Sequence, residues 1–222
     1  MNKKKPEYDD TSMYQIFERI NTGGRSLSPQ EIRNCVYHNE INNLLFELNN
    51  LKEWRILFKQ ANNEPRMKDM EYILRFLMFS NENFQGTTAI SLKKELNLFM
   101  DTNKNNINGS KLELYRRQFI ETMTLLEKIN TSSFENLNSV GHPMGRFHPT
   151  VFDSIAVATI RAIESNIEIP WLDNREEFDR RKKKLVSDTE YIEYITMRTT
   201  NTAHITGRIE LAYKYLYGDV SQ

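Results

Sequence analysis

The chain has 222 residues, which is enough for one sizeable domain with a buried core. Its 30 basic and 30 acidic side chains cancel, so no overall field draws the molecule onto nucleic acid, and contact with DNA would need a local patch. The single cysteine, Cys35, excludes an internal disulfide framework and a cysteine-based zinc site.

The sequence contains no apolar run of roughly 20 residues, the length that is needed to cross a bilayer. The basic segment Met1 to Pro6 is followed by no apolar stretch of the kind that marks a secretory signal. We therefore expect a cytoplasmic protein with no membrane contact and with residues 1–10 flexible. Cys35 has no resolving partner, and we expect it to be a small buried side chain.

Helical periodicity dominates after residue 11. A short helix over Ser12 to Ile20 ends at Asn21-Thr22-Gly23-Gly24, which is a strong helix stop. A second helix then begins, because Ser28 is an N-cap, Pro29 takes the first helical position and Glu31 completes a capping box. Residues 12–38 therefore form a helix, a Gly-Gly turn and a second helix.

The rest of the chain repeats this helical character. Met70, Ile73, Leu74, Leu77 and Met78 follow the spacing of a core-facing helix. Residues 101–109 read as an Asn-rich loop and residues 130–149 as an irregular stretch, and no alternating strand pattern stands out. Further helices are predicted over Asn39–Asn49, Leu51–Gln60, Ser91–Phe99, Leu112–Ile129, Thr150–Glu164, Asp173–Leu185 with Asp173 as its cap, and Ala203–Tyr217. The prediction is one all-α domain over residues 1–222, with about nine or ten helices.

The segment Phe17 to Asn34 is the most informative for chemistry. A Gly-rich turn before a helix N-terminus offers free backbone N–H groups and a positive dipole end, which suit an anion. Arg19, Arg25 and Arg33 would add phosphate contacts, and Asn21 would hold the turn or bond a nucleotide. The simpler interpretation is a helical corner whose Asn and Gly residues supply positive φ. The chemistry alone favours this interpretation, because such turns are common and this one is not a Walker P-loop.

Two other charged segments carry the same two kinds of interpretation. Arg66, Asp69, Glu71 and Arg75 are spaced for ion pairs on an exposed helix face, which we favour over a role for Arg66 or Asp69 in a nucleotide pocket. The second segment is a run of five consecutive basic residues late in the chain. It is best explained as a solvated helix, and contact with a DNA backbone is the alternative. That run consists of Arg180, Arg181, Lys182, Lys183 and Lys184.

The segment Phe17 to Asn34 also resembles a known protein family. The string FERINTGG…L…QEIRNCVY resembles the signature of the GmrSD-type restriction-enzyme N-terminal domain, a ParB/sulfiredoxin-like family. The family pattern F-x-x-x-N-x-x-G-x-x-L-x-x-x-E falls on Phe17, Asn21, Gly24, Leu27 and Glu31. Further segments that resemble the family are Trp54-Arg55, Arg66 to Phe76, Val151-Phe152-Asp153, Thr199-Thr200 and Gly207-Arg208-Ile209.

In that family a ParB-like α/β portion with a D-G-Q-Q-R motif precedes this region and is implicated in nucleotide binding and hydrolysis. The motif is absent here, and so is an HNH nuclease module, since His142 and His148 lie alone in a Gly/Pro loop. We therefore expect no metal site, no catalytic residue and no activity of the chain by itself. The resemblance implies an NTP with Mg²⁺ as cofactor, bound by Phe17, Arg19, Asn21, Thr22, Gly23, Gly24, Glu31, Arg33, Asn34, Arg66 and Asp69.

Two functions compete at this stage. In the first, the chain is part of an anti-phage restriction module, contributes half of a nucleotide site, and couples its helical body to DNA recognition or to a nuclease partner. In the second, it is a non-catalytic interaction subunit or a truncated remnant, and apolar surface near residues 13–45 docks a partner. The partner would carry the ParB-like half or a nuclease, and a homo-oligomer is a further option. A stand-alone nuclease ranks last, because no nuclease constellation is visible.

Overall fold

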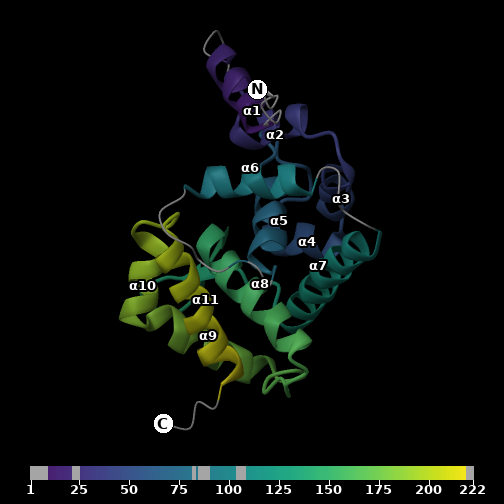
Figure 1. Ribbon diagram of the computed structural model, residues 1–222. Helices are drawn as coiled ribbons and strands as arrows, with labels where there is room; N and C mark the ends of the chain where they lie inside the picture. Colours follow the sequence, from purple (N-terminus) through teal and green to yellow (C-terminus); the bar gives the residue numbers. More distant parts are fainter. Residues whose placement is uncertain (1–9, 22–25, 82–83, 85–90, 104–108, 219–222) are drawn as a thin grey trace, which may run out of the picture.

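The computed structural model describes residues 10–21, 26–81, 84, 91–103 and 109–218, with the side chains of residues 10–12 left aside. These residues form eleven α-helices and one two-stranded sheet, so the all-α prediction is confirmed (Figure 1). The elements are α1 Asp10–Ile20, α2 Pro29–Val36, α3 Glu40–Asn49, α4 Lys52–Phe58, α5 Lys68–Phe79, α6 Leu92–Thr102, α7 Gly109–Ile129, β1 Glu135–Leu137, β2 Pro143–Phe147, α8 Pro149–Glu164, α9 Arg175–Ser187, α10 Thr189–Thr196 and α11 Thr202–Tyr217.

Local capping sets where several helices begin. At α2 the Ser28 hydroxyl accepts a hydrogen bond from the Glu31 N–H, and the Glu31 carboxylate accepts one from the Ser28 N–H, which confirms the predicted capping box. Ser91 caps α6 as predicted. The cap of α9 is Asn174 and not Asp173, because the Asn174 side chain is the one that reaches the N–H of Glu177, three residues on.

Three elements were not predicted, one helix and two strands. Helix α10 is short and is capped by Asp188, whose side chain accepts from the N–H of Tyr191. Strands β1 and β2 form an antiparallel hairpin inside the stretch that was predicted to be irregular, with Glu135 opposite Phe147. Strand β2 is almost entirely exposed, so it carries no buried-exposed alternation by which the sequence could reveal it.

Helix α8 lies at the centre of the fold, and every residue from Thr150 to Ile160 is buried. Helix α11 packs along it on one side, whereas α5 and α7 pack on the other. Trp54 of α4 is fully buried, and its ring centroid lies 5.3 Å from that of Phe152 and 5.7 Å from that of Phe119. In Figure 1, helices α1 and α2 lie at one end of the molecule, and α9, α10 and α11 lie at the other.

None of the helices in the described part of the chain is both long and apolar enough to span a membrane.

Candidate functional site

The candidate site is the corner where α1 meets α2. Asn21 follows α1, and its side-chain amide pairs with the backbone of Leu27: Nδ2 donates to the Leu27 carbonyl over 3.1 Å, and Oδ1 accepts from the Leu27 N–H over 2.8 Å. The Asn21 amide therefore holds the turn, which is one of the two roles that the sequence suggested. Thr22, Gly23, Gly24 and Arg25 of the predicted site lie outside the described residues.

Arg66 ties this corner to the start of α5. Its guanidinium donates to the Ser26 carbonyl over 2.6 Å and forms an ion pair with Glu31 at 3.1 Å. In return, the Ser28 hydroxyl donates to the Arg66 carbonyl over 2.7 Å. The structure thus brings Arg66 and Glu31 together with the turn, as the predicted site requires, and their polar atoms brace the corner internally.

Arg33 occupies the interior, with 1% of its surface exposed. Its Nε donates to Asn97 Oδ1 on α6, and its Nη1 donates to Gln30 and to the Glu71 carboxylate, all at 2.9 Å. The charge of Arg33 is therefore balanced by Glu71, and the guanidinium joins α2 to α5 and α6. This position does not present Arg33 to a ligand in solvent, so the predicted phosphate contact by Arg33 would require the corner to open.

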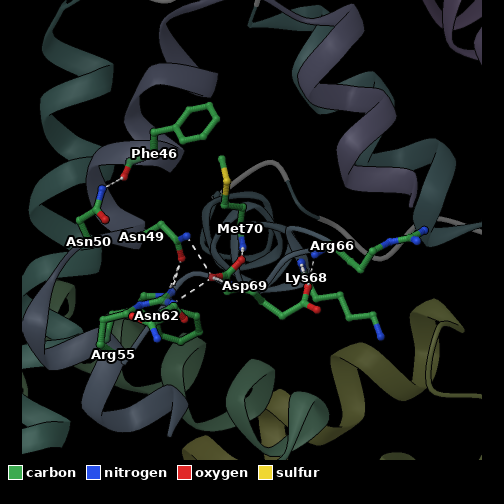
Figure 2. A network of polar contacts seen from close by, with 11 residues as sticks. Phe46, Asn49, Asn50, Arg55, Asn62, Arg66, Lys68, Asp69 and Met70 are labelled. Atoms are coloured by element: carbon green, nitrogen blue, oxygen red, sulfur yellow. Dashed lines mark hydrogen bonds and ion pairs between the residues drawn. The ribbon is translucent and has the colours of Figure 1, made fainter. Parts of the chain in front are cut away.

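Asp69 lies at the centre of a different network, shown in Figure 2. Its Oδ2 accepts from Asn49 Nδ2 at 3.0 Å, from Arg55 Nη1 at 2.9 Å and from the Glu64 N–H at 2.9 Å, while Oδ1 accepts from the Met70 N–H. Asp69 is fully buried, which excludes the predicted exposed ion-pair face at this position. Its partners come from α3, α4 and the loop before α5, so it fastens these elements together and does not face the corner.

Arg75 is also buried, and its prediction as part of an exposed face is wrong. It forms an ion pair with the fully buried Asp153 of α8, and Arg208 of α11 donates to the same carboxylate oxygen at 2.7 Å. Arg208 additionally donates to the Thr199 carbonyl over 2.8 Å. Sequence reasoning missed this ion triad, although all three residues lie in segments that resemble the family. A single Arg within the apolar stripe of α11 was the available signal.

The basic run of α9 divides into buried and exposed members. Arg181 is buried and donates to the Gly218 and Tyr215 carbonyls at the end of α11. Lys182 is buried as well, donates to the Ser132 carbonyl over 2.5 Å, and has its pKa lowered to about 8 by burial. A fully solvated helix is therefore a wrong prediction for these two residues, and neither is positioned for a DNA contact.

The other predicted side chains have varied surroundings. Arg180, Lys183 and Lys184 are exposed, and Arg180 donates two hydrogen bonds to Glu177. Asn34 accepts from Asn42 over 2.8 Å, which is a contact between α2 and α3. Cys35 is exposed, so its predicted burial is wrong, since it lies on the outer side of the short helix α2.

The two histidines of the Gly/Pro loop do not share a site. His142 is exposed at the hairpin, whereas burial lowers the pKa of His148, and the nearby Arg146 lowers it further. In the described part of the chain, no group of three His, Cys, Asp or Glu residues is placed to hold a metal ion.

Helix α1 presents two different faces. Ile16, Phe17 and Ile20 lie three and four residues apart on one face and are 50%, 38% and 73% exposed. Tyr14 and Glu18 lie on another face, where Tyr14 is 1% exposed and Lys93 of α6 forms an ion pair with Glu18. We call the first face the apolar stripe. It lies directly before the Asn21 corner, and all three of its side chains are exposed to solvent in part.

Comparisons of the chain with protein-family models, with curated proteins and with solved structures give no match.

Proposed function

We propose that this chain is the helical part of a restriction-like anti-phage module and that it acts by docking a second domain onto the apolar stripe of α1. The observation that supports this proposal is the exposure of Ile16, Phe17 and Ile20 on one helix face. Burying one such side chain stabilises a complex by about 1.5–3 kcal/mol, so three adjacent ones are a sufficient anchor for a partner. Exposed apolar groups that are clustered in this way mark interaction surfaces.

The second domain is the ParB-like α/β half that the sequence resemblance implies, together with its NTP and Mg²⁺. The corner fits this role because its bonds fix α1 relative to α5: Asn21 holds Leu27, and Arg66 holds Ser26 and Glu31. A partner that binds α1 would therefore bind a surface that is fixed relative to α5. Because the polar atoms of Asn21 and Arg33 are already engaged, the partner supplies most of the direct nucleotide contacts in this arrangement.

The helical body carries no chemistry of its own in this proposal. It relays the docked state to a nuclease or to DNA. In this proposal the exposed lysines Lys183 and Lys184 of α9, at the far end of the molecule, contact the phosphate backbone of DNA.

The test is a binding experiment with a purified ParB-like domain that contains the D-G-Q-Q-R motif, with GTP, ATP or CTP and Mg²⁺. We expect a 1:1 complex by light scattering, weakened at least tenfold by Ile20→Asp, since about 1.4 kcal/mol corresponds to a factor of ten. Val140→Asp, which changes an apolar residue of similar exposure on the hairpin, is the matched control and should leave the complex intact. Absence of a complex with every nucleotide, or equal loss in both variants, would overturn the proposal.

A further inference from the structure

A cleft of about 600 Å³ separates α1 from α6, on the side of α1 that faces away from the apolar stripe. Its walls include Tyr14, Glu18 and Arg19 from α1, and Lys93, Lys94 and Asn97 from α6. Ligand sites for small molecules usually enclose about 300–1,000 Å³, so this cleft has the volume of a nucleotide-sized site.

The charge of the cleft is positive. Three cations, Arg19, Lys93 and Lys94, and one carboxylate, Glu18, line it, and Arg19 has a further interaction of its own. Lys93 is held in place, since its ammonium pairs with Glu18 and lies 5.5 Å from the centre of the Tyr14 ring. Lys94 is exposed and has no ion-pair partner in the described part of the chain. The Coulombic preference of such a wall is for an anion, and the nearby N-terminus of α6 adds to that preference.

The polar groups between these cations are hydrogen-bond donors. Asn97 uses its Oδ1 to accept from Arg33, which leaves its Nδ2 as the group that can serve a ligand. The Tyr14 hydroxyl is fully buried, so the Tyr14 ring contributes wall area to the cleft and its hydroxyl is not exposed to a ligand. A wall with ammonium, guanidinium and amide N–H groups matches the oxygen-rich surface of a phosphate chain.

We propose that this cleft binds a diphosphate-bearing small molecule, with Lys94, Lys93 and Arg19 contacting the phosphates. The site shares Arg19 with the one implied by the sequence resemblance, but its other phosphate contacts, Lys93 and Lys94, come from α6. It does not depend on the docking of a partner, which takes place on the opposite face of the same helix. The isolated chain is therefore sufficient to test it.

The experiment is calorimetric titration of the purified chain with inorganic pyrophosphate, ADP, ATP and GTP at 50 and 300 mM salt. We expect saturable binding that weakens at the higher salt concentration and falls about tenfold in Lys94→Ala, as loss of a charge-assisted hydrogen bond implies. Lys214→Ala is the matched control, since it removes an exposed lysine from α11, at the other end of the molecule. Because the Lys94 side chain is exposed, its removal should leave the fold intact, as far-UV circular dichroism can verify.

Comparing the affinities for pyrophosphate and for the nucleotides also shows which part of the ligand the cleft recognises. Equal affinity for pyrophosphate and for the nucleotides would mean that the phosphates alone are recognised, and tighter nucleotide binding would add a base subsite in the same cleft. Both outcomes support the proposal. It is overturned if no ligand binds the folded chain, or if Lys214→Ala and Lys94→Ala weaken binding equally.

Discussion

Replacing Asp153 with asparagine removes the counterion that Arg75 and Arg208 share in the core. Both guanidinium groups are almost fully buried, and in the described structure no second carboxylate bonds to either of them. The variant keeps the size of the side chain but leaves two cations in a low-dielectric interior without a compensating charge. The Thr199 carbonyl, which already accepts from Arg208, offsets only part of that cost.

Breaking a buried ion pair from one side costs about 3–5 kcal/mol, and a domain of this kind has about 5–15 kcal/mol of total stability. Asp153→Asn is therefore expected to remove about a fifth or more of the free energy of unfolding. Replacing the whole triad with apolar residues, as Arg75→Met, Asp153→Leu and Arg208→Met together, should recover much of the loss, because no charge then remains buried.

The assay is urea unfolding followed by far-UV circular dichroism, with the free energy extrapolated to water. Glu210→Gln is the matched control, because Glu210 of α11 pairs with Arg161 of α8 across the same helix interface, but at the surface. That pair should contribute about 0–1 kcal/mol. The reasoning is refuted if Asp153→Asn lowers the free energy of unfolding by no more than Glu210→Gln does.

Three further predictions concern single side chains. Burial lowers the pKa of Lys182 in the folded state to about 8 from its ordinary value of 10.5, so between these two pH values the unfolded chain binds more protons than the folded one. The free energy of unfolding should therefore rise with pH across that window. In thermal melts, the Lys182→Met variant should not show this rise. Tyr14→Phe removes a buried hydroxyl that lacks a partner, so the melting temperature of the unliganded chain should stay equal or increase, and a large decrease would show a hidden partner. A Cβ at Gly207 would lie 2.4 Å from the Tyr194 ring, so Gly207→Ala should destabilise the fold by about 1–3 kcal/mol in urea unfolding despite its better helix propensity, unless Tyr194→Ala is added to relieve the clash.

Local signals in the sequence predicted the helices well, because capping and periodicity act over a few residues. Ser28 and Ser91 cap the helices that they were expected to cap. The hairpin was missed because β2 is short and exposed. Arg75 was misplaced for a different reason: Glu71 four residues earlier looks like its surface partner, whereas its actual partner, Asp153, is 78 positions away and is brought close only by packing.

The candidate site shows the same division. The role of Asn21 in the turn follows from its place after a helix and before glycines, and the structure shows the corresponding bonds to Leu27. The burial of Arg33 was not predictable, because its neutralising partner Glu71 belongs to another helix. The same holds for Lys182, since a basic run does not reveal which member turns inward.

The exposed hairpin tip around Val140 separates the two sides of the ion triad along the chain. Arg75 precedes it, while Asp153 and Arg208 follow it. A protease that nicks the tip would therefore produce two fragments that each contribute part of one buried charge cluster. The N-terminal fragment alone leaves the buried Arg75 without its carboxylate partner, whereas Asp153 and Arg208 stay together in the C-terminal fragment, so we expect the nicked pieces to remain associated through Arg75 and Asp153. The same feature makes this turn a natural place to split the gene into two complementing halves.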